Sequence, residues 1–283
     1  MRRVGPLLSL AVVILATVAT VATVATVATL AACRHSNPEA LAIAKIRAPD
    51  PATRVDCATL AHPLVLLVMG QSNAGNHGAG PVSPLAVHTL FNDQCFASRD
   101  PLPGATGDGA SLWTRLPLIH GRPLLLIPIA VESTRIDQWT GNGPLRLYVE
   151  NRLKLVGRGA FKVDLVLWQQ GEADARAGTT SAAYRNGLLA LRALLDQHRI
   201  QAPLVIARST YCHGGMADGL AVRAAIDSVS AVPGLVGGPD LDVLQGEMRS
   251  GGCHFSSQGL VAAGRLWAQT LRQLTAPPGS QAN

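Results

Sequence analysis

The sequence predicts a three-layer α/β domain built around a central parallel sheet. Four near-continuous hydrophobic runs have the length of strands, and they lie at residues 64–69, 124–131, 163–168 and 204–207. Runs without polar alternation are typical of parallel strands that helices cover on both faces. Amphipathic stretches separate the later runs, so strands and helices alternate along the chain. This alternation favours a doubly covered sheet that binds its ligands at the carboxyl ends of the strands.

Three of the amphipathic stretches have the period of an α-helix. In residues 181–199, one apolar face is formed at the spacing i, i+4, i+7 and i+11 by Tyr184, Leu188, Leu191 and Leu195. Two later stretches repeat the pattern with Val222, Ile226 and Val229, and with Leu260, Ala263, Trp267 and Leu271. We therefore predict helices whose apolar faces pack on the sheet.

Composition and charge narrow the class of protein. The 283 residues are enough for one large domain or two small ones. Hydrophobic residues make up 48% and charged residues 15%, which excludes a disordered chain and a coiled coil. The formal net charge is +6, but the arginines are scattered along the chain rather than clustered. We therefore expect no nucleic-acid partner.

Residues 1–33 are predicted to be a signal segment. Arg2 and Arg3 precede an uncharged, mostly apolar run, residues 4–32, which has the pattern of a signal sequence. The run leads into Leu30-Ala31-Ala32-Cys33, which resembles the lipobox of bacterial lipoproteins and implies acylation of Cys33. The alternative is an uncleaved anchor, because the run is long enough to span a bilayer. In both cases we expect a membrane-anchored protein outside the cytoplasm, in the periplasm or at the outer membrane of a bacterium.

The rest of the chain is expected to divide into a tether, a domain and a tail. Residues 34–56 are polar, contain proline and show no clear period, which suits a tether. The folded domain is predicted to span residues 57–275, and a short tail follows at residues 276–283.

The four cysteines of this domain are predicted to form two disulfides. Their number is even, and the expected compartment is oxidising. We favour Cys57 with Cys95 and Cys212 with Cys253, although four cysteines allow three pairings. Four buried free thiols are the alternative.

Three segments bring chemically useful side chains to strand ends or to the start of a helix. GQSNAGNHG follows the first strand at residues 70–78, and its glycines allow tight turns that expose Ser72 and its N–H. WQQGEAD ends the third strand at residues 168–174 with an amide and two carboxylates. GGCHFSSQG, at residues 251–259, presents His254 just before the last helix. A serine needs a neighbouring base to become a nucleophile, and histidine suits that task near neutral pH.

These three segments, in this order, look like those of the SGNH hydrolase superfamily. The resemblance is to the branch of sialate O-acetylesterases and plant-type acetylxylan esterases, and it spans about residues 64–270. It implies a flavodoxin-like fold and ester hydrolysis without a cofactor. It also implies Ser72 as the nucleophile, His254 as the base, and the Gln170 amide in the oxyanion hole beside the Ser72 N–H.

The turn after the second strand departs from the pattern of that branch. Gly-Gly-Thr is usual there, whereas this chain has Glu132-Ser133-Thr134. A backbone N–H donor needs no particular side chain. Ser133 can therefore supply the second oxyanion contact if its backbone reaches the same conformation.

The loop of the histidine departs as well. The branch has an aspartate three residues before the histidine, and this chain has Gly251 at that position. Asp242 or Glu247 can be the third member if either folds back to the His254 imidazole. Otherwise a backbone carbonyl orients the ring, and the site is a Ser-His dyad.

These residues predict a serine esterase that removes acetyl or other short acyl groups from O-acylated carbohydrates outside the cytoplasm. The missing aspartate leaves open a non-catalytic glycan-binding protein on the same fold, and a polysaccharide O-acetyltransferase would use the same residues. We expect Glu172 and Asp174 to be loop and helix-cap carboxylates. We expect no metal, because His77, His213 and Cys212 lack the spacing of metal ligands.

Overall fold

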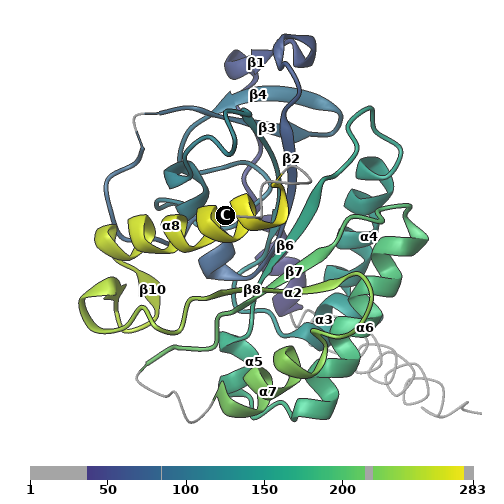
Figure 1. The fold of residues 1–283 in the computed structure, drawn as a ribbon, viewed down its shortest axis with the longest axis vertical. Coiled ribbons are helices and arrows are strands. Elements are labelled where there is room, and N and C mark those ends of the chain that lie inside the picture. The colour runs from purple at the N-terminus through teal and green to yellow at the C-terminus, as the bar shows by residue number, and fades with distance from the viewer. Residues whose placement is uncertain (1–36, 84, 214–218, 277–283) are drawn as a thin grey trace, which may run out of the picture. The chain divides into compact units, whose positions relative to one another are not determined.

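An eight-stranded sheet forms the centre of the fold in the computed structural model (Figure 1). The structure describes residues 37–83, 85–213 and 219–276. The strands lie in the order β1-β4-β3-β5-β2-β6-β7-β8. Their bounds are β1 Arg54–Val55, β2 Leu64–Gly70, β3 Val87–Phe91, β4 Gln94–Ser98, β5 Leu124–Ala130, β6 Leu165–Gln169, β7 Leu204–Arg208 and β8 Leu235–Asp240. In this spatial order, all neighbouring strands from β3 through β5, β2, β6 and β7 to β8 are parallel. β4 is antiparallel to both β3 and β1.

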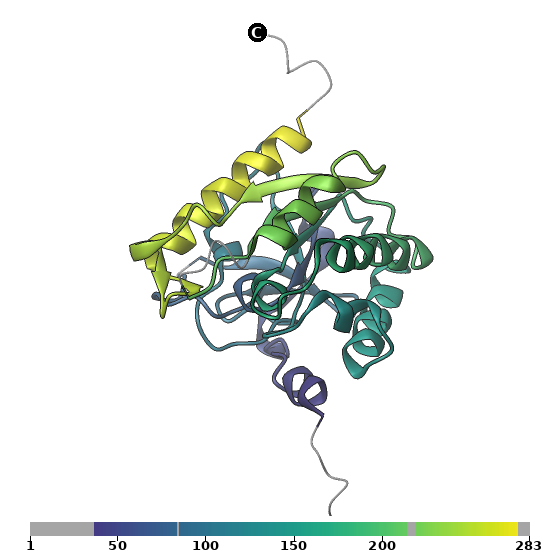
Figure 2. The same cartoon turned by 90° about the horizontal axis from the view of Figure 1, so that it is seen from below.

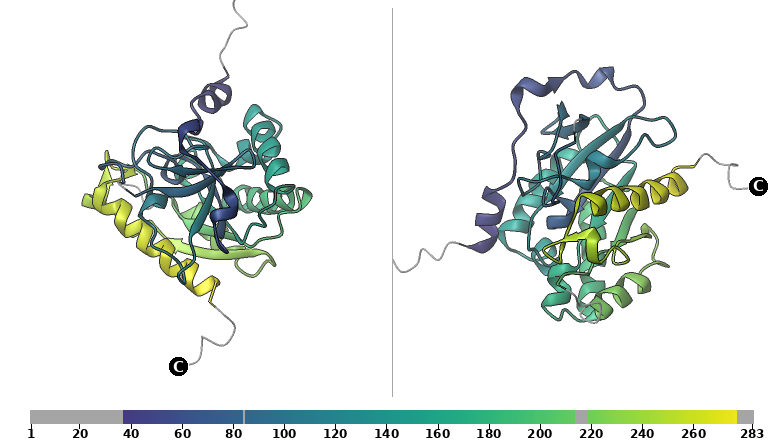
Figure 3. Two further views of the ribbon diagram at one scale, coloured as in Figure 1. Left: turned by 90° about the horizontal axis from the view of Figure 1, so that it is seen from above. Right: turned by 90° about the vertical axis from the view of Figure 1, so that its left-hand side faces the viewer.

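Helices cover both faces of this sheet. Their bounds are α2 Pro38–Ala44, α3 Ile136–Thr140, α4 Pro144–Val156, α5 Glu172–Arg176, α6 Ser181–Gln197, α7 Leu220–Ser228 and α8 Ser257–Leu274. Figures 2 and 3 show α8 on one side of the sheet, and Figure 2 shows α4 and α6 on the other. The predicted three-layer α/β architecture with a central, largely parallel sheet is therefore confirmed.

Alternate residues of β2 explain why two layers are needed. Val65, Leu67 and Met69 join a core that contains side chains of α3, α4, α6 and α7. Leu64, Leu66 and Val68 join a second core that contains side chains of α8. Every residue of the strand is buried, and burying one such side chain contributes about 2 kcal/mol. A continuous apolar run therefore requires helices on both faces.

The structure contains the two predicted disulfides with the favoured pairing. Cys57–Cys95 joins the segment before β2 to β4, the strand next to the edge strand β1. Cys212–Cys253 joins the loop after β7 to the residue that precedes His254. The second disulfide thus fixes the backbone next to the proposed base.

The N-terminal predictions are only partly within the described residues. The signal segment, residues 1–33 with Cys33, lies outside them. Residues 39–55 of the expected tether are part of the compact unit that begins at Glu39, because β1 pairs with β4 and Glu39 accepts hydrogen bonds from Gln138 and Leu145. Helix α2 buries none of its residues, which explains its lack of an apolar period. Over the described ranges, no helix is both long and apolar enough to cross a bilayer.

Candidate active site

Ser72 lies in a tight turn at the carboxyl end of β2. The strand ends at Gly70, where φ is 145° and a side chain would collide with the carbonyl oxygen of Gln169. Ser72 then begins a 3-10 helix, Ser72–Ala74, and is 4% exposed. Its backbone N–H donates to no other described residue. The turn thus places a hydroxyl group and an unused N–H where ligands of such sheets bind.

His254 belongs to a short hairpin formed by β9, Arg249–Ser250, and β10, His254–Phe255. The buried Arg249 guanidinium fastens this hairpin with three hydrogen bonds of 2.6–2.8 Å. It donates them to the carbonyl oxygens of Leu244, Cys253 and Leu241. Because Cys253 is also in a disulfide, the chain on the N-terminal side of His254 is held by two independent links.

The turn of Ser72 and the hairpin of His254 meet in the structure. Asn73 Nδ2 donates a hydrogen bond to the Cys253 carbonyl oxygen at 3.3 Å. Ala79 N donates to the Phe255 carbonyl oxygen at 2.8 Å. The fold therefore places side by side two segments that are far apart in the sequence, each carrying one residue of the expected pair.

A second histidine and a carboxylate lie beside His254. The ring centroids of His77 and His254 are 5.2 Å apart. His77 Nε2 lies 3.3 Å from Glu132 Oε2, and Lys45 Nζ donates to Glu132 Oε1 at 2.7 Å. Burial, followed by the charges of His77 and Arg249, lowers the pKa of His254 to about 4, and Glu132 opposes this shift. His254 is therefore neutral near neutral pH, as a general base must be.

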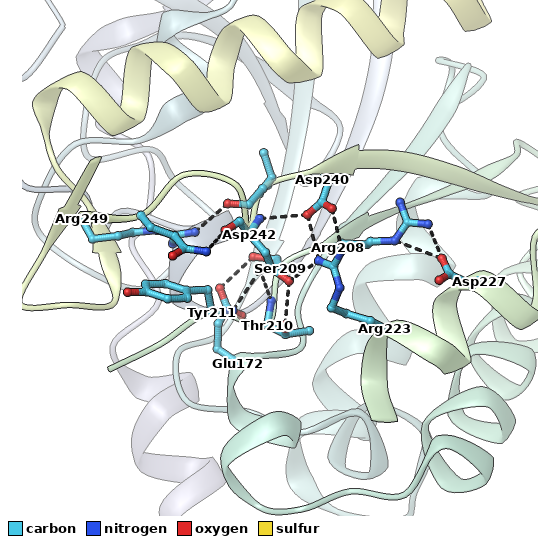
Figure 4. Close-up of polar contacts among 12 residues, drawn as sticks. Glu172, Arg208, Ser209, Thr210, Tyr211, Arg223, Asp227, Asp240, Asp242 and Arg249 are labelled. Atoms are coloured by element: carbon cyan, nitrogen blue, oxygen red, sulfur yellow. Dashed lines mark hydrogen bonds and ion pairs between the residues drawn. The ribbon is translucent and has the colours of Figure 1, made fainter. Parts of the chain in front are cut away.

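Asp242 does not fill the place of the missing aspartate. Its Oδ1 accepts hydrogen bonds from the backbone N–H groups of Thr210 and Tyr211, at 2.6 and 2.9 Å. Its Oδ2 accepts from Thr210 Oγ1 at 2.6 Å and from Arg223 at 2.7 Å (Figure 4). The carboxylate is buried and fully used in holding the loop after β7. The expectation that it orients His254 is corrected accordingly.

Glu247 shows no contact that would make it the third member. It lies on a 3-10 helix, Gly246–Met248, and its side chain is exposed. Its carboxylate forms no hydrogen bond or ion pair with a described residue, although its backbone oxygen accepts from Ser256 Oγ. Glu132, rather than Asp242 or Glu247, is the carboxylate whose charge acts on His254.

Ser133, the expected second oxyanion donor, has a left-handed backbone conformation. It lies in the turn between β5 and α3 with a φ of 58°, which glycine adopts more readily than other residues. Its N–H donates to no described residue. Serine thus takes a left-handed conformation at the position where the resemblance predicts glycine.

Gln170 is placed differently from its expected role. The side chain is completely buried, and its Nε2 donates to Thr134 O at 2.9 Å, to Asp174 Oδ2 at 2.6 Å and to Gln71 Oε1 at 3.2 Å. An amide group has only two hydrogens, so none is left for an oxyanion. Gln170 instead links the residue before Ser72 to the residue after Ser133. It therefore positions the two free backbone N–H groups.

Positioning roles at the site were not predicted for Asn73, Glu172 and Arg249. Asn73 and Glu172 both lie in the recognised segments, and Asn73 Nδ2 donates to Glu172 Oε1 at 2.7 Å. Ser209 Oγ donates to the same oxygen at 2.8 Å (Figure 4). Their motifs could have indicated them. Arg249 follows no motif, and only the folded hairpin shows its function.

One cluster has the residue types of a metal site but not their chemistry. Potential ligand atoms of Cys212, His213 and Cys253 lie within 4.8 Å of one another. Both sulfurs belong to a disulfide, whereas a metal ligand is a free thiolate. The cluster is therefore part of the structure that holds His254.

The fold, with a serine at the end of a central strand, is compatible with an ester hydrolase of the α/β class. The sequence profile of the family described as carbohydrate esterase, sialic acid-specific acetylesterase, matches residues 113–273, which is more than half of the chain. The chain belongs to this family and is a carboxylic ester hydrolase. The matched range includes His254 and Gln170 and begins after Ser72, so the case for Ser72 depends on its place in the fold.

Solved structures show the same fold. A protein from Arabidopsis thaliana has a TM-score of 0.60 and 19% identity, over 75% of this chain and 98% of that one. NanS has a TM-score of 0.50 and 15% identity, over 76% of this chain and 98% of its own. A comparison with curated protein sequences finds no match. The expected SGNH-type architecture is confirmed.

Proposed function

We propose that this chain is an extracytoplasmic serine esterase that removes acetyl or other short acyl groups from O-acylated carbohydrates. One observation carries the proposal. Ser72 lies at the end of a central strand with a free N–H, beside the hairpin of a neutral His254, in a member of a carbohydrate esterase family. Ser72 is only 4% exposed, which favours a small acyl group at its hydroxyl.

In the proposed mechanism, Ser72 Oγ attacks the ester carbonyl carbon while His254 takes its proton. The backbone N–H groups of Ser72 and Ser133 donate to the resulting oxyanion. The tetrahedral intermediate then collapses, and His254 protonates the departing sugar hydroxyl. Water, deprotonated by His254, hydrolyses the acyl-enzyme and frees Ser72.

Glu132 supplies the negative charge that favours the imidazolium in this mechanism. It lies against His77, which lies against His254. We expect Glu132→Gln to lower kcat by about tenfold, because the Lys45 charge is then left unbalanced near the developing imidazolium. The comparison variant is Glu247→Gln, which should retain full activity. A hundredfold loss for Glu247→Gln, with folding intact, would identify Glu247 as the third member instead.

A second substitution, Gly251→Asp, tests whether the site is a Ser-His dyad without a third member. Gly251 has a φ of 57°, and a Cβ added there meets no atom within 4 Å. Asp and Ala both strain this backbone, so Gly251→Ala controls for the strain. If no carboxylate hydrogen-bonds the ring, the Asp variant should exceed the Ala variant by about tenfold in kcat, because charge-assisted hydrogen bonds are the stronger ones. Equal activities would mean that the ring already has such a partner.

The location outside the cytoplasm and the membrane attachment are part of the proposal. Two disulfides suit an oxidising compartment, and the sequence of residues 1–33 suits lipidation at Cys33 or an uncleaved anchor. Metabolic labelling of the expressed protein with a fatty acid, in parent and Cys33→Ala forms, separates these two attachments.

The test of the function is a panel of acyl sugars. The protein is incubated with sugars that carry acetyl, propionyl, butyryl or octanoyl esters, and the free acid is measured. We expect fastest release of acetate. Binding of the acylated sugar without acid release would indicate a glycan-binding protein, and transfer of the acetyl group to a second sugar would indicate an acetyltransferase.

A further inference from the structure

Two buried oxygen atoms next to the nucleophile have no hydrogen-bond partner. They are Asn73 Oδ1 and Glu172 Oε2. The two side chains are already in contact, since Asn73 Nδ2 donates to Glu172 Oε1 at 2.7 Å. An unpartnered buried oxygen costs free energy, and two of them on one contacting pair call for a common cause.

The missing partner is one proton. An amide oxygen and an ionised carboxylate only accept hydrogen bonds, whereas a neutral carboxyl group also donates one. Turning the Asn73 amide around does not help, because its nitrogen serves two acceptors, Glu172 Oε1 and the Cys253 carbonyl oxygen. A hydrogen on Glu172 Oε2 would make that atom a donor, and the side chain that it already contacts carries an unpartnered acceptor, Asn73 Oδ1.

We propose that Glu172 is protonated in the working enzyme and forms a pair with Asn73 joined by two hydrogen bonds, which positions Ser72 and the hairpin of His254. This inference rests on the proposed function of Ser72 and His254. Asn73 follows Ser72 directly, and its amide also holds the Cys253 carbonyl next to His254. The pair therefore holds the segments of the nucleophile and the base in fixed positions relative to each other.

The surroundings of Glu172 favour the neutral form. The residue is completely buried, and burial raises its pKa to about 7, against opposing hydrogen bonds from Asn73 and Ser209. The titratable groups that act in this part of the core are Arg249 from β9, Tyr184 from α6, Asp174 from α5 and Asp242 from the loop after β8. Arg249 is the cation among them, and its nitrogens are engaged by three carbonyl oxygens.

Ionisation of Glu172 would disturb the positions of Ser72 and the His254 hairpin relative to each other. It places a charged oxygen near Asn73 Oδ1, and the second hydrogen bond is lost. Activity should therefore fall as the pH rises through the pKa of Glu172. On the acid side, activity should fall as the pH drops through the pKa of His254. The profile of kcat/KM against pH should be a bell with limbs near pH 4 and pH 7.

The test is Glu172→Gln, which keeps the shape of the side chain and carries a permanent N–H toward Asn73. With p-nitrophenyl acetate, we expect kcat/KM at about pH 6 to stay within about tenfold of the parent, and the alkaline limb to disappear while the acid limb remains. Glu172→Ala, which forms neither bond, should lose on the order of 10²-fold. The matched control is Glu150→Gln on α4, which should keep both limbs. Loss of activity in the Gln variant comparable to the Ala variant would overturn the proposal.

Two measurements do not depend on catalysis. Infrared spectra at about pH 6 should contain the carbonyl band of a protonated carboxylic acid that disappears in Glu172→Gln. The parent should also lose thermal stability relative to Glu172→Gln as the pH rises from about 4.5 to about 7, because only between the ordinary pKa of 4.5 and the raised pKa of the folded state does folding bind an extra proton. The pair would be overturned if the band were the same in the parent and in Glu172→Gln and if the stability curves of the two proteins ran parallel. A parent that shows the band yet hydrolyses no ester would sink the proposed function and leave the pair supported.

Discussion

Ser72→Ala should lower kcat/KM for an acetylated sugar by about 10⁴-fold or more, because no other group in the site can form the acyl-enzyme. The remaining rate comes from binding and from the two backbone N–H donors, which the substitution leaves in place. The hydroxyl of Ser72 holds no structural hydrogen bond with a described residue, so thermal unfolding should stay nearly unchanged. Initial rates and a thermal unfolding curve on the same samples measure both effects.

The matched control for this variant is Ser230→Ala. Ser230 is exposed and remote in the chain from the three recognised segments, so its loss should leave the rate unchanged. Activity of Ser72→Ala within about tenfold of the parent would remove Ser72 from the mechanism.

His254→Asn should cost about as much as Ser72→Ala near neutral pH. When two residues act as a unit in catalysis, removing either one loses nearly the full rate enhancement. The variant should also lose the acid limb of the pH profile, because the neutral form of His254 is the one that acts and its pKa is lowered to about 4. Rates of parent and variant over a range of pH, on one substrate, test both statements.

His62→Asn is the control, because His62 is exposed, precedes β2 at the end of that strand opposite to Ser72, and has a backbone conformation, with φ at 46°, that asparagine accepts. It should retain the rate and the acid limb. If His254→Asn kept the acid limb at the same pH, the limb would belong to another group and His254 would not be the base.

The central strands could be predicted because burial on both faces requires a near-continuous hydrophobic run in the sequence. The outer strands of the sheet lack such a continuous hydrophobic run. β3 and β4 form a partly exposed hairpin with mixed polarity, and β8 contains Gly237, Gly238 and Pro239, which are poor strand residues. β8 forms because β7 offers it a parallel partner. Its place in the sheet is thus set by tertiary pairing rather than by its own sequence.

The residues of the site also differ in whether the sequence could predict them. Ser72 and His254 lie in glycine-containing segments, and Ser133 lies in the turn after a predicted strand, so the sequence could locate all three. The groups around them come from distant parts of the chain, such as Glu132 beside His77. Asp242 was a reasonable candidate by sequence distance, but its carboxylate is used by Thr210, Tyr211 and Arg223. Sequence distance cannot show which way a buried carboxylate points, and the polar network around it decides the outcome.

Gln170 shows the limit of a resemblance. The resemblance implied an oxyanion donor here, yet the amide hydrogens are used by Thr134, Asp174 and Gln71. The sequence located the residue correctly, and only the hydrogen-bond count changed its role from contact with the substrate to positioning of the turns.

Covalent labelling of the nucleophile is the most direct test of the account. The protein is treated with a p-nitrophenyl alkylphosphonate, digested and analysed by mass spectrometry, with Ser72→Ala and His254→Asn treated in parallel. We expect a single phosphonylated peptide containing Ser72 in the parent, no adduct in Ser72→Ala and slow labelling in His254→Asn. An adduct on another residue, or ester hydrolysis by a protein that the phosphonate neither labels nor inhibits, would contradict it.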